Sequence, residues 1–196
     1  MNILVIKSSV FGDNGNSSSL VNSQLAALQA QHPDATVVVR DLSTDPIPHL
    51  DGERVGAFFT PADQRSEDQQ AVDAFSMALI DELKTADHIV LGLPMYNFGI
   101  PSQLKSWIDH VARAGITFRY TENGPQGLLD DKPVTVLAAR GGLYAGTEND
   151  TVTPYIKLFF GFIGMTDVNF VYAEGLNMGD ETKEKAMSEA QAALAG

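Results

Sequence analysis

The sequence contains no cysteine among its 196 residues. Disulfide bonds, thiolate metal ligands and thiol catalysis are therefore excluded. Basic residues are also few, with 13 lysines and arginines against 25 acidic residues and a formal net charge of −12. The chain offers no basic stripe to neutralise phosphates, so we expect no nucleic-acid partner. An anionic membrane surface would repel so acidic a protein.

Long hydrophobic runs are missing as well. The longest apolar stretch, within residues 155–165, is too short to cross a bilayer. The apolar start MNILVIKSS is too short for the core of a secretory signal. The four histidines are scattered without a metal-ligand spacing such as HExxH, so we expect no metal site. We expect a cytoplasmic protein in which residues 1–196 form a single domain, because no linker or repeat divides them.

The sequence does contain an alternation of apolar strand patterns and helical patterns. Near-continuous apolar runs predict five buried strands, at residues 2–7, 36–41, 88–93, 133–139 and 167–172. Helical patterns separate and follow them, the first ended by His32-Pro33 and the third begun by Pro101. This alternation predicts an α/β fold with three α/β/α layers and a five-stranded parallel sheet in the flavodoxin-like order 2-1-3-4-5.

Two segments interrupt the alternation. Residues 42–65 contain three prolines and are predicted to be irregular. Residues 116–129 are predicted to form a short extended excursion with a turn at Asn123-Gly124. In the third helix, Trp107 belongs to the apolar stripe and is expected in the core, whereas His110 is expected to be exposed or capped.

The position of a ligand site is predicted from the loops that follow the strands. In a parallel sheet of this order, a ligand binds outside the carboxyl ends of the strands, between the first and third strands of the chain. The least ordinary loops of the sequence fall there. They are SSVFGDNGNSSS at 8–19, PMYNFG at 94–99 and RGGLYAG at 140–146.

The first loop favours an anion. Asn16 and Ser17 follow Gly15 where a helix is predicted to begin, and free N–H groups at a helix start bind phosphate. Simple N-capping by Asn16 or Ser17 is the alternative interpretation of these residues. Neither GxxxxGK[ST] nor GxGxxG follows the first strand, which weighs against a P-loop nucleotidase and a Rossmann-type nicotinamide site.

The other two loops favour a flat ring. Met95, Tyr96 and Phe98 offer polarizable surfaces beside the Asn97 amide, and the glycines within residues 139–142 let a ligand approach the backbone closely. Each loop has a simpler interpretation. Residues 94–99 could be a hydrophobic loop tucked under the irregular segment at 42–65, and residues 139–142 could be an ordinary tight turn. A phosphate at the first loop and a planar ring at the other two together describe flavin mononucleotide (FMN).

Longer motifs add a family resemblance. The sequence resembles the FMN-dependent NADH-azoreductases, also described as NADH:quinone oxidoreductases of flavodoxin-like fold. The most specific motifs are MYNF at 95–98 and ARAGITFRYTENGP at 112–125. The others, in family order, are KSS at 7–9, RDL at 40–42, PIPHLDGE at 46–53, RGG at 140–142 and TPYIKLFFGFIGMTDVNFVYAEG at 153–175.

The resemblance implies a homodimer with one FMN per subunit and ping-pong kinetics. NADH or NADPH delivers hydride to the flavin N5 and leaves, and a quinone or azo compound then takes two electrons. No catalytic side chain is required, because FMN carries the chemistry. Carried over by position, the FMN contacts are Ser9, Gly15, Asn16, Ser17, Met95, Tyr96, Asn97, Phe98, Ala139, Arg140, Gly141 and Gly142. The implied substrate residues are Asn97, Tyr144 and, across the dimer interface, Tyr120 and Phe162.

Two positions depart from the family pattern. Ala139 stands where Ser is common, and Tyr144 stands where well-known members have His. The physiological acceptor and the choice between NADH and NADPH stay open at this point. Two other functions also stay open: a flavodoxin-like electron carrier without NADH-dependent turnover, and a flavin-free interaction module on the same scaffold.

Overall fold

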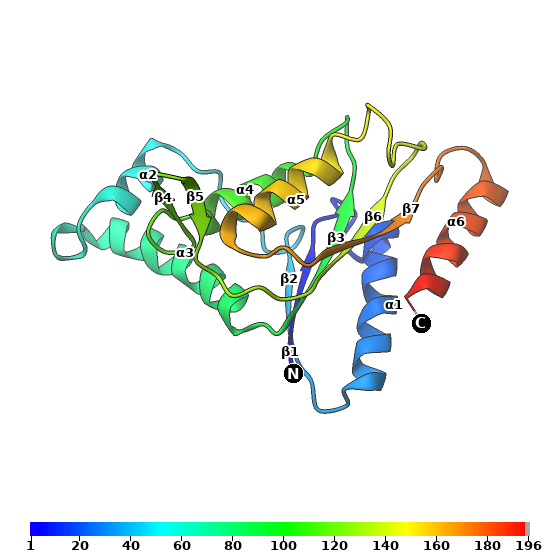
Figure 1. Ribbon diagram of the computed structural model, residues 1–196, viewed down its shortest axis with the longest axis horizontal. Helices are drawn as coiled ribbons and strands as arrows, with labels where there is room; N and C mark the ends of the chain where they lie inside the picture. Colours follow the sequence, from blue (N-terminus) through cyan, green and yellow to red (C-terminus); the bar gives the residue numbers. More distant parts are fainter. Residues whose placement is uncertain (195–196) are drawn as a thin grey trace.

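The computed structural model describes residues 1–194 and contains a five-stranded parallel sheet between two layers of helices (Figure 1). The strands of this sheet are β1 (Asn2–Lys7), β2 (Thr36–Asp41), β3 (His88–Pro94), β6 (Val134–Ala139) and β7 (Val168–Ala173). Their order is β2-β1-β3-β6-β7, and every neighbouring pair is parallel. The predicted fold and strand order are confirmed.

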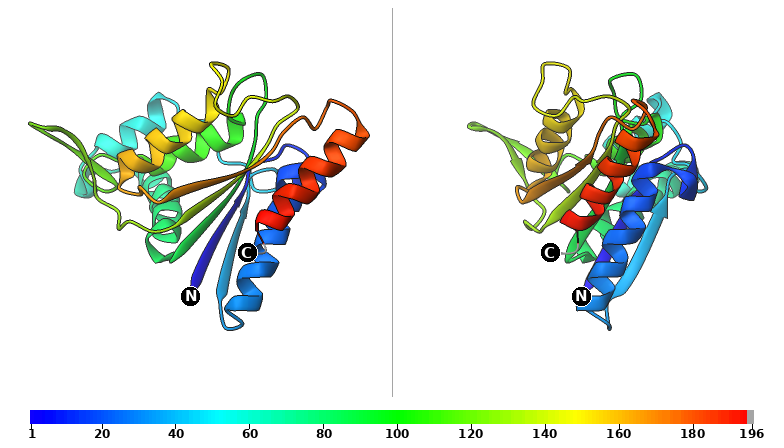
Figure 2. Two further views of the ribbon diagram at one scale, coloured as in Figure 1. Left: turned by 45° about the vertical axis from the view of Figure 1, so that its right-hand side comes forward. Right: turned by 90° about the vertical axis from the view of Figure 1, so that its right-hand side faces the viewer.

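Helices cover both faces of the sheet (Figure 2). One layer consists of α1 (Asn16–Gln31) and α6 (Asp180–Ala193), and the other of α3 (Glu67–Thr85), α4 (Ser102–Val111) and α5 (Val152–Ile163). Short 3-10 turns, η1 (Gly12–Asn14) and η2 (Ala62–Gln64), complete the connections. No helix within residues 1–194 is long and apolar enough to cross a membrane.

Alternate residues of the strands supply two separate cores. In β1, Ile3 and Val5 pack in the core beneath α1 and α6, whereas Leu4 and Ile6 pack in the core beneath α3, α4 and α5. All four side chains are buried, which explains why the strand is apolar at each position from Ile3 to Ile6. Trp107 lies in the second core with 1% of its surface exposed, as predicted.

The prediction that residues 42–65 are irregular is wrong in part, because α2 (Gly52–Phe59) forms within them. The Asp51 side chain caps this helix by accepting the N–H of Arg54 at 2.9 Å. Prolines flank the segment on both sides and conceal a helix of only two turns, anchored by the buried side chain of Ala57.

His110 of α4 is buried beneath this segment, so the expectation of an exposed or capped side chain is wrong. Its Nε2 atom lies 3.0 Å from the carbonyl oxygen of Pro48, and its ring lies edge-on to Phe58 and Phe75. Burial lowers the pKa of His110, because the imidazolium loses its hydration. Residues 42–65 thus leave the carboxyl end of β2 and cover α4 through His49, Pro48 and Phe58.

The predicted excursion at residues 116–129 is confirmed as an antiparallel hairpin of β4 (Phe118–Thr121) and β5 (Gly124–Gly127). Its turn is formed by Glu122 and Asn123, one residue before the predicted Asn123-Gly124, because Gly124 already pairs with Thr121. The hairpin projects from the body of the molecule (Figure 2). At its base, a Cβ built on Gly127 would overlap the backbone of Gly164, so a glycine is needed where the hairpin passes the end of α5.

Candidate functional site

Two adjoining hollows lie at the carboxyl edge of the sheet. The first, of about 170 Å³, is named the α1 hollow and is lined by Ser9, Phe11, Gly15, Asn16, Ser17, Pro94, Met95, Tyr96, Ala139, Arg140, Gly141, Leu176 and Asn177. The second, of about 250 Å³, is named the turn hollow and is lined by Met95, Asn97, Phe98, Gly141, Tyr144 and Asn177. Every predicted cofactor residue except Gly142 therefore lines one hollow or the other.

The start of α1 forms the floor of the α1 hollow. Gly15 is the N-cap residue, and no side chain caps the helix, so the alternative of capping by Asn16 or Ser17 is wrong. Ser17 is 1% exposed, and its Oγ atom has no hydrogen-bond partner in the described part of the chain. Buried hydroxyls are rarely left unpaired in folded proteins. A hydroxyl next to free helix N–H groups fits an anionic group such as a phosphate.

In the loop after β1, a glycine allows the start of α1 to lie close to Ser9. A Cβ built on Gly15 would overlap the Oγ atom of Ser9, so no larger residue fits there. The loop is also tied to the next strand, because Ser8 Oγ donates to the Gly92 carbonyl oxygen at 2.6 Å. Lys7 forms an ion pair with Asp13 at 2.6 Å and is largely buried. Its charge is therefore already balanced, and helix N–H groups and hydroxyls remain as the anion ligands.

The turn after β3 borders the other hollow and is strained. Tyr96 and Gly99 exchange backbone hydrogen bonds of 3.0 and 2.9 Å, and the two residues between them have positive φ, +50° at Asn97 and +60° at Phe98. This is the geometry of a type I′ turn, which usually holds Asn and Gly. Phe98 is 56% exposed, so the alternative of a turn tucked under residues 42–65 is wrong.

The Tyr96 side chain connects the two loops. Its hydroxyl lies 3.3 Å from Ser9 Oγ and 3.4 Å from the Val10 nitrogen. The aromatic residue that adjoins Phe98 is Tyr144, with ring centroids 5.7 Å apart at an angle of 70°. Phe98 and Tyr144 thus form an aromatic wall beside the turn hollow, contributed by the loops after β3 and β6.

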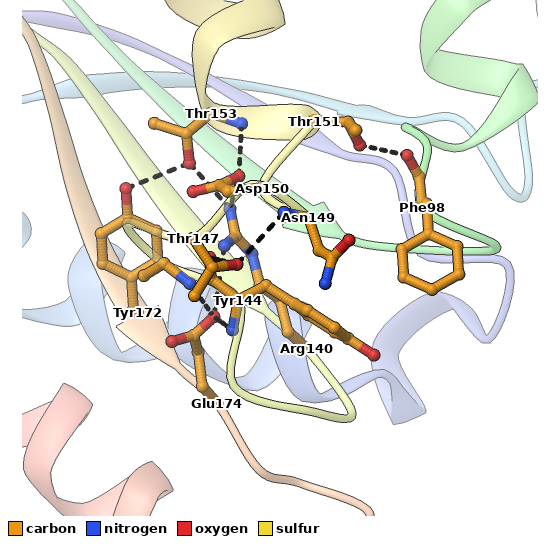
Figure 3. A network of polar contacts seen from close by, with 11 residues as sticks. Phe98, Arg140, Tyr144, Thr147, Asn149, Asp150, Thr151, Thr153, Tyr172 and Glu174 are labelled. Carbon is orange, nitrogen blue, oxygen red and sulfur yellow. Dashed lines mark hydrogen bonds and ion pairs between the residues drawn. The ribbon is translucent and has the colours of Figure 1, made fainter.

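A buried arginine organises the loop after β6 (Figure 3). Arg140 is 1% exposed, and its guanidinium donates to Asp150 at 2.9 Å, to Glu174 at 3.2 Å and to the Thr153 hydroxyl at 2.7 Å. The same Glu174 oxygen accepts the N–H groups of Tyr144 and Ala145, both at 2.9 Å. The Arg140 side chain therefore positions the loop through these hydrogen bonds.

The network also fixes the charge of its carboxylates. Burial raises the pKa of Asp150, but hydrogen bonds from the Thr153 N–H and from Arg140 outweigh it, and the pKa lies below its ordinary value. Asp150 is thus anionic beside the buried guanidinium. The Thr151 hydroxyl extends the network by donating to the Phe98 carbonyl oxygen, which joins the far end of the loop to the strained turn.

Four lining residues were missed by the sequence analysis: Phe11, Pro94, Leu176 and Asn177. Two of them belong to the loop after β7, which also ends at the carboxyl edge of the sheet, so its glycines, Gly175 and Gly179, were the available signal. Tyr120 and Phe162 do not line the hollows. Tyr120 is 76% exposed on the hairpin, and Phe162 stacks on Phe118 with centroids 4.2 Å apart. Their contact with a second subunit stays a prediction.

A five-stranded parallel sheet of this order, with hollows beside the start of α1 and beside the turn after β3, defines a protein of the flavodoxin-like class. A family model described as a flavodoxin-like fold matches residues 1–196. The chain belongs to this family and, within it, to the FMN-dependent NADH:quinone oxidoreductases.

Relatives and solved structures place the chain in this branch. An FMN-dependent NADH:quinone oxidoreductase of Alcanivorax borkumensis is 82% identical over 194 residues, which cover 99% of this chain and 98% of that protein. One from Cellvibrio japonicus is 55% identical over 189 residues, covering 96% and 94%. The crystal structure of azoreductase AzrA matches with a TM-score of 0.90 at 29% identity, covering 100% of this chain and 97% of that one. An FMN-dependent NADH-azoreductase from Bacillus anthracis in complex with FMN matches with a TM-score of 0.88 at 27% identity, covering 99% and 97%.

Proposed function

We propose that this protein is an FMN-dependent oxidoreductase that passes two electrons from NADH, through bound FMN, to a quinone or an aromatic azo compound. The observation that carries the proposal is the junction of two hollows, one with a buried unpaired hydroxyl at a helix start and one with an aromatic wall. The names of the relatives, which include quinone oxidoreductases and an azoreductase solved with FMN, agree with this chemistry.

In this proposal the α1 hollow holds the phosphate of FMN. Ser9, Asn16 and Ser17 contribute hydroxyl and amide groups, and the first N–H groups of α1 contribute their dipoles. Gly15 leaves the space that a tail needs to reach the helix start. The absence of a free basic side chain fits a neutral cradle, in which hydrogen bonds rather than ion pairs hold the anion.

The turn hollow holds the ring. Met95, Asn97 and Phe98 line it from the loop after β3, and Gly141 and Tyr144 line it from the loop after β6. The N–H groups of Gly141 and Gly142 donate no hydrogen bond to the described residues, so they are available to a ring edge. When bound, FMN supplies the redox chemistry. The chain's own residues orient the ring and exclude water from one face of it.

The reductant and the acceptor share one pocket in turn, which makes the kinetics ping-pong. Asn97 and Tyr144 border the turn hollow on its open side, where both substrates would approach the ring. An aromatic wall of Phe98 and Tyr144 suits flat partners such as a nicotinamide, a quinone or an azo dye. NADH is named as the reductant because the relatives carry it in their names.

We further propose a cytoplasmic homodimer of single-domain subunits, each with one FMN. An apolar groove of about 480 Å³ adjoins Phe98 between the starts of α4 and α5. Large apolar side chains are exposed nearby and on the hairpin, among them Leu158 at 72% and Tyr120 at 76%. A second copy would cover these surfaces, and Tyr120 and Phe162 would then border the partner's pocket.

The test is reconstitution followed by rapid mixing. We expect the purified chain to bind one FMN per subunit, to be reduced by NADH in a stopped-flow instrument and to be reoxidised by 1,4-benzoquinone. Bound FMN that NADH does not reduce would favour the electron carrier instead. A chain that takes up no added FMN would favour the flavin-free interaction module. Replacing NADH by NADPH in the same assay measures the preference between them.

A further inference from the structure

Asn177, in the loop after β7, lies where the two hollows meet. Met95, Gly141 and Asn177 are the three residues that line both hollows. Asn177 is the one among them with hydrogen-bonding groups in its side chain. A carboxamide at this junction faces whatever connects an anion in the first hollow to a ring in the second.

The backbone holds Asn177 firmly in this position. Its N–H donates to the Gly141 carbonyl oxygen at 3.0 Å, and the two preceding N–H groups donate to Arg140 at 3.1 Å and to Gly142 at 3.0 Å. The loop after β7 therefore runs against the loop after β6 along three consecutive residues. Asn177 cannot move away without breaking this set of bonds.

The side chain itself is placed by contact and left unpaired. Its Nδ2 atom lies 2.5 Å from where a Cβ on Gly141 would stand, so it packs directly over that glycine. Asn177 is exposed, and no hydrogen bond joins its carboxamide to another residue among 1–194, so both ends are free for water or for a ligand. The backbone, rather than burial, holds this amide where a ligand that spans the two hollows would meet it.

We propose that the Asn177 carboxamide hydrogen-bonds to the bound flavin at a part other than its phosphate. This inference rests on the proposed function, since it assumes that FMN occupies the hollows. The phosphate is assigned to Ser17, which lines the α1 hollow alone, whereas Asn177 lines both hollows. The ribityl hydroxyls and the ring carbonyls are the flavin groups that a carboxamide can serve as both donor and acceptor.

The experiment compares two flavins on the apoprotein. Dissociation constants for FMN and for riboflavin, which lacks the phosphate, are measured from flavin fluorescence for wild type, Asn177→Ala, Ser17→Ala and Met178→Ala. We expect Asn177→Ala to weaken both flavins by the same factor, roughly 3- to 10-fold, as for the loss of one neutral hydrogen bond. Ser17→Ala should weaken FMN and leave riboflavin unchanged. Met178 is exposed, adjoins Asn177 and lines neither hollow, so its substitution should change nothing.

A second variant gives a readout that a structural role would not move. Asn177→Asp keeps the shape and one acceptor but adds a negative charge beside the flavin. We expect the midpoint potential of bound FMN to become more negative, because reduction adds negative charge to the same site. An unchanged potential, or unchanged riboflavin affinity in Asn177→Ala, would overturn the inference. A loss confined to FMN would also overturn it, because the amide would then serve the phosphate. If the wild type binds neither flavin, the proposed function itself fails.

Discussion

At the scale of single residues, the strongest constraint lies in the turn after β3. Asn97 and Phe98 both have positive φ, a region that costs an L-residue roughly 1–3 kcal/mol. Asparagine tolerates it comparatively well, whereas a bulky aromatic residue does not. Glycine would fit the type I′ turn without strain, so the backbone does not require a phenylalanine here, and the contact that its ring makes is with Tyr144 beside the turn hollow. The strain is confined to the site.

We predict that Phe98→Gly stabilises the apoprotein and impairs the reaction. Removing the side chain relieves the strain, so the free energy of unfolding should rise by about 1 kcal/mol in urea titrations. The aromatic wall is lost at the same time, so the KM for a quinone should increase. The control is Phe11→Gly, which removes an exposed ring from a residue at negative φ and should not stabilise the protein. A less stable Phe98→Gly protein would contradict the assignment of strain.

At the scale of secondary-structure elements, the loop after β6 is held from outside itself. Arg140 at its start and Asp150 at its end form a buried ion pair, and Glu174 at the end of β7 supports both the arginine and the loop backbone. Breaking one partner of a buried pair leaves the remaining charge uncompensated. The loop's conformation therefore depends on a residue from the neighbouring strand, and Figure 3 shows the three anchors together.

We predict that Glu174→Ala loosens residues 143–149. The N–H groups of Tyr144 and Ala145 lose their acceptor, and Arg140 loses one of its two carboxylates, so the fold should be destabilised by about 2–4 kcal/mol. Hydrogen exchange followed by mass spectrometry should show faster exchange in this loop while β1 and β3 remain protected. Glu148→Ala, a substitution at an exposed residue of the same loop, is the control. Unaltered exchange in Glu174→Ala would show that the Glu174 carboxylate does not hold the loop.

The sequence predicted the elements better than the contacts between them. Five near-continuous apolar runs predicted the parallel sheet, and the loops after β1, β3 and β6 predicted the place of the site. α2 was missed because prolines flank its two turns. The burial of His110 was missed for the same reason, since α2 and the residues before it are what cover this side chain. The ion pair of Arg140 with Glu174 and the place of Asn177 at the hollows could not be predicted from local pattern. Both depend on how the loop after β7 packs against the loop after β6.

At the scale of the whole molecule, the unusual feature is an apolar surface on a protein of net charge −12. The groove beside Phe98, the outer side of α5 and the projecting hairpin present Leu158, Tyr120 and Leu128 to solvent. Large apolar patches on soluble proteins mark interaction sites. Charge repulsion between two such acidic copies would have to be overcome by the burial of this surface.

We predict that Leu158→Glu converts the proposed dimer to a monomer. A carboxylate in the centre of an apolar interface is desolvated without a partner, which opposes association. Light scattering coupled to size-exclusion chromatography should show half the mass, and quinone reduction should fall if the partner completes the pocket. Val39→Glu is the control, because Val39 is 51% exposed on the edge strand β2, at the opposite edge of the sheet from β7, the strand that follows α5. A dimer that survives Leu158→Glu would move the interface elsewhere.

The ion pairs of Arg140 with Asp150 and Glu174 determine which residues of this loop can be substituted during evolution. Arg140 and Asp150 lie at the two ends of the loop, and Glu174 lies directly after β7. The residues between the two ends, 143–149, belong to neither hydrophobic core. Substitutions within residues 143–149 can therefore leave the packing of both cores unchanged. Tyr144, which borders the turn hollow, is one of these residues, so its side chain can change while the anchors stay in place. A change at Arg140, Asp150 or Glu174, by contrast, leaves a buried charge without its partner.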